Sequence, residues 1–526
     1  MTAIRWVFLL ALAISACTGK SRPQDSTLPA LPPQKTAVEQ VRGEIRPTRE
    51  LLIALSGEVR GEIEPCGCPT LPYGGFARRS AALRQMSGGL PLFQLDAGDA
   101  LLKGLRTAGR EDASDRGSVV LDMMIEIGVD LMVPGPSDVR VVGMEGLKKL
   151  PARGLRIASA TWVDEDGKTL FPAAVVLERG GVRLGVVGLS APVTGVRSRD
   201  AVEAARDALA SLPPGLDLVV AVTNLPEADR VRVATEVSGL SALLSTPGDT
   251  YDKPTFGVGA AQVEVGDRGR YLTMVRVRAS SAPGLPLDPG AERQLRDLDI
   301  LREQVARLSA SGAVDEAILA QLRAAEDGIV AAGAGRNLVR IFERPLGSDL
   351  DGPGELDKTI ADFKERQQGA ARQRVKQSPE EWSPSYATSS GCVRCHSLQF
   401  ARWTYTGHAR ATATLVERKA QQDLECVGCH TTGFGEKGGF AETDPATLRV
   451  YGGVQCEACH GPLAGHPKDD RAVVRPISED TCRGCHDPAN SPNFDYATYL
   501  PRVACPRDER GAATMQPGSD PLPPAP

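Results

Sequence analysis

One short pattern occurs four times in the C-terminal part of this chain. It constrains the possible structures of that part more than any other feature of the sequence. Each copy has two cysteines separated by two residues and followed directly by a histidine. The copies are Cys392, Cys395 and His396; Cys426, Cys429 and His430; Cys456, Cys459 and His460; and Cys482, Cys485 and His486. Cysteines three apart lie on one face of a helical turn, so both can bond one porphyrin while the histidine meets its iron. The pattern is typical of covalent c-type heme attachment, and it predicts four hemes.

The spacing of the motifs says how this region must be built. All four motifs fall within 95 residues, which is too few for four separate protein cores. We therefore expect the hemes to form much of the interior and to lie close together. Structural zinc is the rival interpretation, because two C-x-x-C pairs can make a four-cysteine zinc site. Zinc gives no reason for a histidine after every pair, so heme is favoured.

The histidine count limits how the irons can be ligated. The chain has only 6 histidines and none precedes His396. Four follow the motifs as proximal ligands, and we expect the other two, His408 and His466, to be distal ligands. At most two of the four hemes then have histidine on both sides. The remaining hemes need a methionine, a lysine, water, a neighbouring chain or nothing. Met515, the only methionine after Met274, lies in the polar tail, so at least one open iron position is expected.

The N-terminus has the features of an export signal. Arg5 precedes a short apolar run over residues 6–14, which ends in Ile-Ser-Ala-Cys at Cys17. This ending resembles a bacterial lipobox, which implies that residues 1–17 are a lipoprotein signal peptide and that Cys17 is lipidated. The alternative is an ordinary cleaved signal with an incidental cysteine. Residues 18–48 are polar and proline-rich and are predicted to be a disordered tether. The predicted location is the periplasmic side of a bacterial membrane, inner or outer, where thiols can be oxidised.

The rest of the chain divides into regions of different pattern. Residues 49–280 alternate strand-like and helix-like runs, which predicts an α/β sheet with helices on its faces. Residues 281–384 are predicted to be a helical connector, with a helical hairpin over 290–333 as a packing arm or a dimerising coiled coil. Residues 385–505 are the mostly α-helical, loop-rich heme region, and residues 506–526 are a disordered tail. The net charge of -5 does not favour a nucleic-acid partner.

The heme region resembles the tetraheme cytochromes that accept electrons from hydroxylamine oxidoreductase. The resemblance covers roughly residues 385–490. It rests on four segments: Gly391 to His396, Trp403 to Ala409, Cys429 to Phe434, and Gly453 to His466. It implies electron transfer through stacked hemes, with His408 and His466 as distal ligands. It does not define the electron donor or acceptor.

The N-terminal region resembles the calcineurin-like metallophosphoesterases, in the branch of periplasmic 5′-nucleotidases and UDP-sugar hydrolases. The match lies in the segments 61–65, 74–79, 95–99 and 127–135, and it implies an α/β sandwich. That family holds two metal ions with Asp, His and Asn ligands, and here most of these ligands are missing. The opening Asp-x-His step falls at Glu58-Val59-Arg60, and the Asn-His-Glu step falls at Pro136-Ser137-Asp138.

Further along the chain the transfer of metal ligands also fails. The later single histidine falls near Asn224, and the Gly-His-x-His step falls near residues 245–249, without a histidine. Only the Asp of the Gly-Asp pair survives, as Asp99. Because no imidazole remains in this region, phosphoesterase activity is not expected. A retained scaffold that binds a ligand or a partner is the better interpretation.

Two cysteines of the N-terminal region are not explained by the metal site of the metallophosphoesterases. Cys66 and Cys68 lie in a Pro-Cys-Gly-Cys-Pro loop after the first predicted strand. They are a candidate redox or soft-metal pair, or alternatively a disulfide or an inert surface pair. The resemblance includes exported relatives with the same step. Cys505 is left over, as their partner or as a free thiol.

These features favour an exported, lipid-anchored multiheme c-type cytochrome that carries electrons between redox partner proteins. We assign no catalytic residue, and an electron carrier is favoured over an enzyme. The first alternative is an oxidoreductase that acts on a small nitrogen or sulfur compound at a five-coordinate heme. The second alternative is a binding module for a redox partner, built on the inactive phosphoesterase scaffold.

Overall fold

The computed structural model describes a large part of the chain, with gaps. It covers residues 49–65, 73–86, 89–101, 111–246, 254–256, 259–266, 269–280, 283–366, 386–418, 420–421, 424–434, 436, 438–440, 445–469, 474–486, 491 and 493–506. Cys17, the tether, the Cys66–Cys68 pair and residues 507–526 of the tail lie outside these residues. Over the described ranges, no helix combines the length and the apolar character that crossing a membrane requires.

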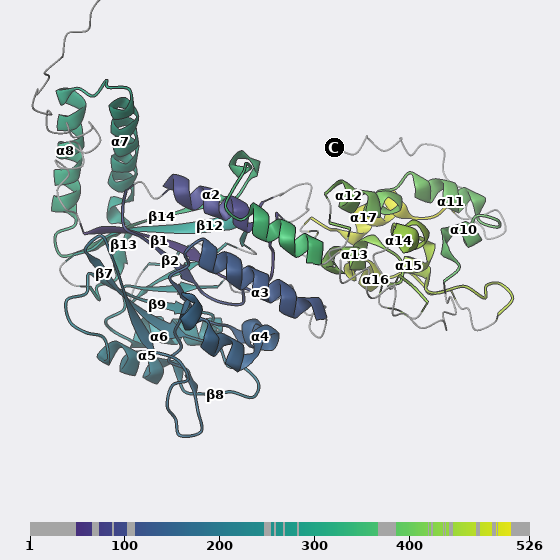
Figure 1. Ribbon diagram of the computed structural model, residues 1–526, viewed down its shortest axis with the longest axis horizontal. Helices are drawn as coiled ribbons and strands as arrows, with labels where there is room; N and C mark the ends of the chain where they lie inside the picture. Colours follow the sequence, from purple (N-terminus) through teal and green to yellow (C-terminus); the bar gives the residue numbers. More distant parts are fainter. Residues whose placement is uncertain are drawn as a thin grey trace, which may run out of the picture.

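Two β-sheets form the centre of the N-terminal part (Figure 1). The seven-stranded sheet has the order β13-β14-β12-β1-β2-β3-β4, and the five-stranded sheet has the order β11-β10-β9-β7-β6. The strands of the first are β1 (Glu50–Ser56), β2 (Leu92–Asp96), β3 (Leu131–Met132), β4 (Arg156–Ile157), β12 (Tyr271–Arg278), β13 (Leu287–Asp288) and β14 (Asn337–Pro345). Those of the second are β6 (Ala174–Arg179), β7 (Val182–Leu189), β9 (Leu218–Thr223), β10 (Ala242–Ser245) and β11 (Ala261–Glu264). A separate two-stranded ribbon joins β5 (Trp162–Val163) and β8 (Arg197–Ser198).

Strand β1 shows why the sheets pack as they do. All seven of its residues are buried, and successive side chains of a strand point to opposite faces. Leu51, Ile53 and Leu55 pack in the cluster between the two sheets. Leu52 and Ala54 pack in a second cluster on the outer face of the seven-stranded sheet. A strand with apolar residues on both faces must be covered on both sides, so the layers follow from the sequence.

Helices cover the two outer faces. On the seven-stranded sheet lie α2 (Phe76–Met86), α3 (Glu111–Glu126) and α4 (Pro136–Lys149), and on the five-stranded sheet lie α5 (Ala201–Ala210) and α6 (Glu227–Glu236). Leu83, Met123 and Leu147 come from the first three helices into one cluster. Val202 and Val233 come from the other two into another. The predicted α/β sandwich is therefore confirmed.

The predicted helical hairpin is present as α7 (Glu292–Ala310) and α8 (Glu316–Ala332). The two helices stand out from the edge of the sheet region in Figure 1. The structure differs from the expected connector in what flanks them. Strand β14 pairs with β12 in antiparallel register from Leu338 opposite Arg278 to Pro345 opposite Tyr271, and β13 pairs with β14. The seven-stranded sheet therefore continues beyond residue 280 and includes strands from both sides of the hairpin.

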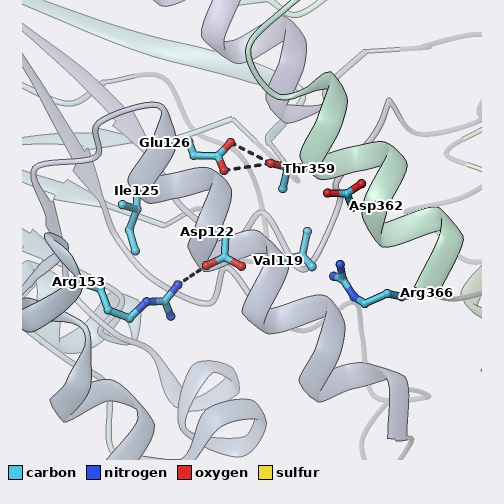
Figure 2. Close-up of a pocket in the computed structure, with 8 residues that line it drawn as sticks. All are labelled: Val119, Asp122, Ile125, Glu126, Arg153, Thr359, Asp362 and Arg366. Atoms are coloured by element: carbon cyan, nitrogen blue, oxygen red, sulfur yellow. Dashed lines mark hydrogen bonds and ion pairs between the residues drawn. The ribbon is translucent and has the colours of Figure 1, made fainter.

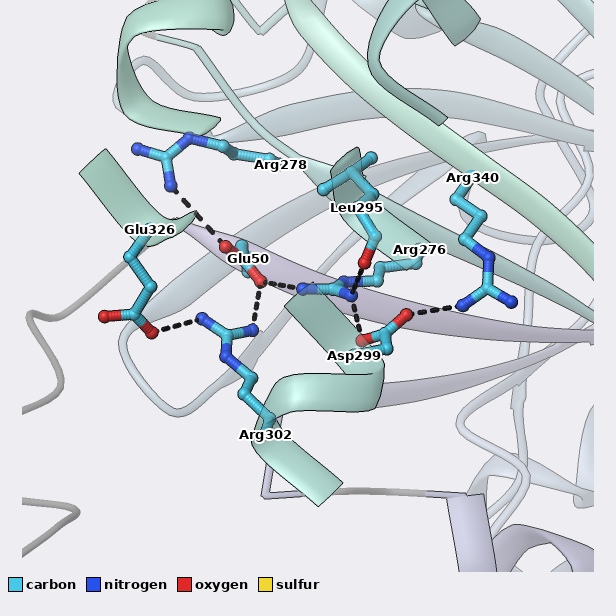
Figure 3. A network of polar contacts seen from close by, with 8 residues as sticks. All are labelled: Glu50, Arg276, Arg278, Leu295, Asp299, Arg302, Glu326 and Arg340. Carbon is cyan, nitrogen blue, oxygen red and sulfur yellow. Dashed lines mark hydrogen bonds and ion pairs between the residues drawn. The ribbon is translucent and has the colours of Figure 1, made fainter. Parts of the chain in front are cut away.

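A buried ion network joins the hairpin to the sheet (Figure 3). Glu50 of β1 has a fully buried side chain and accepts hydrogen bonds from Arg276 and Arg302, each at 2.7 Å. Arg302 of α7 also donates to Glu326 of α8 at 2.9 Å. Asp299 receives hydrogen bonds from Arg276 and Arg340. The Glu50 carboxylate thus links β1 to Arg276 of β12 and to Arg302 of α7. Arg302 extends the link to α8.

A further helix, residues 357–366, packs on α3. Its Phe363 is buried in the cluster that covers the outer face of the sheet. Thr359 donates to the Glu126 carboxylate at 2.9 Å, and Lys364 pairs with Glu64 at 2.7 Å. Figure 2 shows Thr359, Asp362 and Arg366 on one side of a polar pocket whose other side is α3. Residues 283–366 thus contact the N-terminal part extensively.

The described part of residues 386–506 contains helices and turns and no strand of a sheet. The helices are α10 (Thr388–Cys392), α11 (Ser397–Thr404), α12 (Ala411–Glu417), α13 (Leu424–His430), α14 (Pro445–Tyr451), α15 (Cys456–His460), α16 (Glu479–Arg483) and α17 (Tyr496–Val503). Its apolar cluster is centred on five buried residues, Tyr386, Leu415, Val427, Phe440 and Tyr451. The described polypeptide buries little apolar surface of its own here, as expected if bound groups complete the interior.

Candidate heme-binding site

Each C-x-x-C-H motif lies on or beside a helical turn. Cys392 ends α10, α13 and α15 contain the second and third motifs, and Cys482 lies in α16. In the first motif, the His396 amide donates to the Cys392 carbonyl at 3.0 Å. In the fourth, the His486 amide donates to the Cys482 carbonyl at 2.9 Å. Helical geometry places the two thiols of a motif on one side, and in the described structure none of the eight motif cysteines is in a disulfide.

The structure brings His466 opposite His396. Their ring centroids are 6.5 Å apart, and the ring planes differ by 29°. This separation is too large for direct stacking. Two imidazoles on opposite sides of one metal ion, each bonded at about 2 Å, have centroids about 6 Å apart. The pair therefore leaves space for one iron between the two rings, at the first motif.

A second pair joins His408 and His486. The ring centroids are 6.1 Å apart with an angle of 41° between the planes. The orientation of His486 is set by its surroundings, because its Nδ1 lies 2.8 Å from the Ser491 hydroxyl and its ring stacks on Phe494 at 4.7 Å. Burial lowers the pKa of His408, and a neutral imidazole is the form that binds a metal. This pair fits an iron at the fourth motif.

His430 and His460 have no histidine ring facing them in the described structure. All six histidines are within the described residues, and neither of these two makes a ring contact with another histidine there. The Nδ1 of His430 lies 2.6 Å from the Ala411 carbonyl. A carbonyl only accepts, so Nδ1 carries the proton and Nε2 keeps its lone pair. Burial lowers the pKa of both imidazoles. The residues fit a heme with one histidine ligand at the second and third motifs.

Glu457 and Gln455 connect the first and third motifs. The Glu457 carboxylate accepts the backbone N–H groups of Ala387 and Thr388, at 2.9 and 2.7 Å. The Gln455 side-chain carbonyl accepts the Ser389 N–H at 2.7 Å. These three donors lie at the start of α10, which ends in Cys392. The two motifs therefore have a fixed relative position.

In the N-terminal part, the positions of the family's first metal ligands hold an internal ion pair. Arg60 donates to the Glu58 carboxylate at 2.6 Å. Glu58, Arg60 and Asp99 all have positive φ, at 47°, 52° and 52°, which is uncommon for residues other than glycine. The backbone of the loops is thus of the kind found at active sites, whereas the side chains of Glu58 and Arg60 pair with each other.

Two other positions of the family's metal site have structural roles. The Asp138 carboxylate accepts four backbone N–H groups, those of Asp99, Ala100, Leu101 and Gly135, at 2.8 to 3.1 Å. The Asn224 amide donates to the Ala97 and Val133 carbonyls, and its oxygen accepts the Ala191 N–H at 2.7 Å. Both side chains use their polar atoms to hold loops together. Residues 247–249 lie outside the described residues.

Asp138→Asn is expected to lower the free energy of unfolding by about 3 kcal/mol. The amide keeps one acceptor oxygen and turns an NH₂ group toward two backbone donors, which leaves buried donors without partners. Urea unfolding followed by circular dichroism measures the change. Glu145→Gln on α4, where Glu145 is exposed and pairs with Lys148, is the matched control and is expected to change stability by less than about 0.5 kcal/mol. Equal losses of stability in Asp138→Asn and Glu145→Gln would contradict the structural role assigned to Asp138.

Comparison with known proteins agrees with the predicted resemblance of the C-terminal part. Residues 391–461 match the family model of cytochrome c554 and c-prime. Cytochrome c-554 of Nitrosomonas europaea is 40% identical over 95 residues, which are 15% of this chain and 40% of that protein. The match thus spans less than half of the relative's length. Residues 391–461 contain three of the four C-x-x-C-H motifs, so the family match lies within the predicted heme region.

The N-terminal part is similar to solved structures that include a 5′-nucleotidase precursor and a calcineurin-like phosphoesterase, as predicted. They include a 5′-nucleotidase precursor from Thermus thermophilus, with 19% identity, 45% of this chain, 52% of that chain and a TM-score of 0.38. A sulfate thiohydrolase SoxB of the same species has 20% identity, 45% and 56% coverage and a TM-score of 0.38. The calcineurin-like phosphoesterase YfkN of Bacillus subtilis has 13% identity, 62% and 99% coverage and a TM-score of 0.41. The chain spans about half the length of the first two.

Proposed function

We propose that this protein is an exported, lipid-anchored cytochrome that carries electrons through four covalently bound c-type hemes. The observation that carries the proposal is the set of four C-x-x-C-H motifs, two of which have a second histidine opposite the first at 6.5 and 6.1 Å. Cys17 is the proposed lipid attachment site, on the periplasmic side of a bacterial membrane. Redox partner proteins are the proposed donor and acceptor.

The roles of the chain's own residues follow from their positions. The eight motif cysteines form the thioether bonds, and His396, His430, His460 and His486 are the proximal ligands. His466 and His408 are the distal ligands of the first and fourth motifs. Heme supplies one-electron redox chemistry. The backbone carbonyl of Ala411 and the hydroxyl of Ser491 hold the Nδ1 atoms of two proximal histidines, which orients the rings and exposes Nε2 to a metal.

A spectroelectrochemical titration of the full-length exported protein tests the proposed function. We expect the absorption bands of a c-type heme, complete reduction at low potential and complete recovery on reoxidation over several cycles. A protein purified with zinc in place of heme, or hemes that cannot be reduced and reoxidised, would contradict an electron carrier.

The second candidate is an oxidoreductase that acts on a small nitrogen or sulfur compound at an open iron. It is favoured by the absence of a histidine partner for His430 and His460 among the six described histidines. We expect carbon monoxide to shift the reduced spectrum of two hemes at most, because histidine occupies both sides of the other two. A spectrum that carbon monoxide, nitric oxide and hydroxylamine leave unchanged would exclude the open sites.

The third candidate concerns the N-terminal domain as a binding module for a redox partner. It is favoured by the Glu58–Arg60 ion pair and by the structural roles of Asp138 and Asn224, which keep the loops ordered without metal ligands. Capture of redox proteins by the full-length chain, compared with a chain whose loops carry Arg60→Ala and Glu58→Ala, tests this role. Equal capture by both chains would contradict it.

A further inference from the structure

The third motif contains a buried carboxylate at one of the two variable positions between its cysteines. Glu457, between Cys456 and Cys459, is only 2% exposed. It accepts three backbone N–H groups, from Ala387 at 2.9 Å, Thr388 at 2.7 Å and Leu463 at 2.7 Å. Burying an ionised carboxylate is costly unless its oxygens are hydrogen-bonded, and here both oxygens are.

The three donors belong to different functional segments. Ala387 and Thr388 open the helix that ends in Cys392 of the first motif. Leu463 lies in the loop between His460 and His466, and this loop carries the histidine that faces His396. One carboxylate thus joins the first motif, the third motif and the loop of a distal ligand.

The charge of Glu457 is not neutralised by an ion pair. Within the part of the chain that the structure describes, its hydrogen-bond partners are backbone amides and no lysine or arginine pairs with it. Backbone dipoles stabilise the carboxylate but leave its net charge in place. Charges interact more strongly across a buried region than across water, so the groups bound at the two neighbouring motifs experience this charge.

We propose that Glu457 is a positioning residue that also tunes redox potential. It fixes the first and third motifs relative to each other, and its negative charge favours the oxidised state of the hemes held there. Reduction adds one electron from the donor protein and takes an iron from ferric to ferrous. A fixed negative charge stabilises the more positive ferric state, so it lowers the reduction potential. This inference rests on the proposed function, because it requires hemes at these motifs.

The test compares Glu457→Gln and Glu457→Asp with the unaltered full-length protein. Heme content is measured first, and the midpoint potentials are then obtained by spectroelectrochemical titration. We expect Glu457→Gln to keep its heme content and to raise two of the four midpoints while the other two stay unchanged. Glu457→Asp keeps the charge and is expected to restore the two midpoints most of the way.

A matched control removes a carboxylate beside another motif. Glu479→Gln lies three residues before Cys482, where the Glu479 side chain is 46% exposed and paired with Arg483, and it is expected to leave all four midpoints unchanged. Full heme content with unchanged midpoints in Glu457→Gln would overturn the inference. Equal shifts in Glu457→Gln and Glu457→Asp would also overturn it, since the charge would then not be the cause. An unaltered protein without covalent heme would instead overturn the proposed function.

Discussion

His408→Ala is expected to convert one heme from six-coordinate and low-spin to five-coordinate and high-spin. The His408 ring lies 6.1 Å from that of His486, the separation expected for two imidazoles that share an iron through bonds of about 2 Å. Removing one imidazole leaves a heme with a single histidine ligand. Electron paramagnetic resonance of the oxidised protein counts the two spin states. The number of low-spin hemes with two histidine ligands should fall from two to one.

His466→Ala is expected to give the same change at a different heme. The double variant should therefore lack both of these low-spin signals while it retains all four covalently attached hemes. Thr404→Ala is the matched control for His408→Ala. Thr404 lies four residues before His408, is exposed, and donates its hydroxyl only to the Ala401 carbonyl. Spin states that stay unchanged in both histidine variants would show that these residues are not ligands.

Glu50→Gln is expected to lower the free energy of unfolding by about 3–5 kcal/mol, the cost of breaking a buried ion pair. The Glu50 side chain is fully buried, and it faces Arg276 and Arg302 at 2.7 Å and Arg278 at 3.5 Å. Without the charge, buried arginines are left uncompensated. Urea unfolding followed by circular dichroism measures the loss.

The matched control for Glu50 lies on α7, the helix whose Arg302 pairs with Glu50. Glu303 is 69% exposed and pairs with Arg307 at 3.6 Å, so Glu303→Gln is expected to change stability by less than about 0.5 kcal/mol. A loss in Glu50→Gln no larger than that of the control would contradict the role of the buried network.

The same carboxylate gives the unfolding free energy a pH dependence. Burial raises the pKa of Glu50, but attraction by Arg276 and Arg302 outweighs burial and leaves it below its usual value. A carboxyl with a lowered folded-state pKa adds stability that is present above its unfolded pKa of about 4.3 and is lost as pH falls through the folded value. We expect stability to fall more steeply below about pH 4 in the unaltered protein than in Glu50→Gln. Parallel acid curves would contradict this.

The sequence alone predicted the elements that depend on a local pattern of residues. Alternating apolar runs predicted the α/β sandwich, and leucines at helical spacing such as Leu295 and Leu298 predicted the hairpin, whose buried face they form. Strand β14 was not predicted, because its place in the sheet depends on pairing with β12 across a long hairpin. Pairing over such a separation leaves no local pattern to read.

Buried charges were the main feature that the sequence did not reveal. Arg276 and Glu50 are 226 residues apart, and charged residues on α7 are typical of a solvent-exposed face. Glu457 occupies a variable position of a C-x-x-C-H motif, where nothing in the spacing distinguishes a buried carboxylate from an exposed one. Only three-dimensional packing shows that these groups are enclosed.

The candidate ligands illustrate the same limit. A count of histidines predicted two distal ligands, His408 and His466, but not which motif each would face. His466 follows the third motif in sequence and lies opposite His396 of the first, while His408 lies opposite His486 of the fourth. The loop that carries His466 is held by contacts such as the hydrogen bond from the Leu463 N–H to Glu457. Such contacts form only in the folded chain.

The most direct test of the account is the ratio of covalently bound heme to protein in the purified chain. The pyridine hemochrome spectrum gives the heme concentration, and mass spectrometry of the denatured protein shows whether heme stays attached. We predict four hemes per chain, with the eight motif cysteines unavailable to thiol reagents. A ratio of three or fewer, or motif cysteines that react as free thiols, would contradict the central claim.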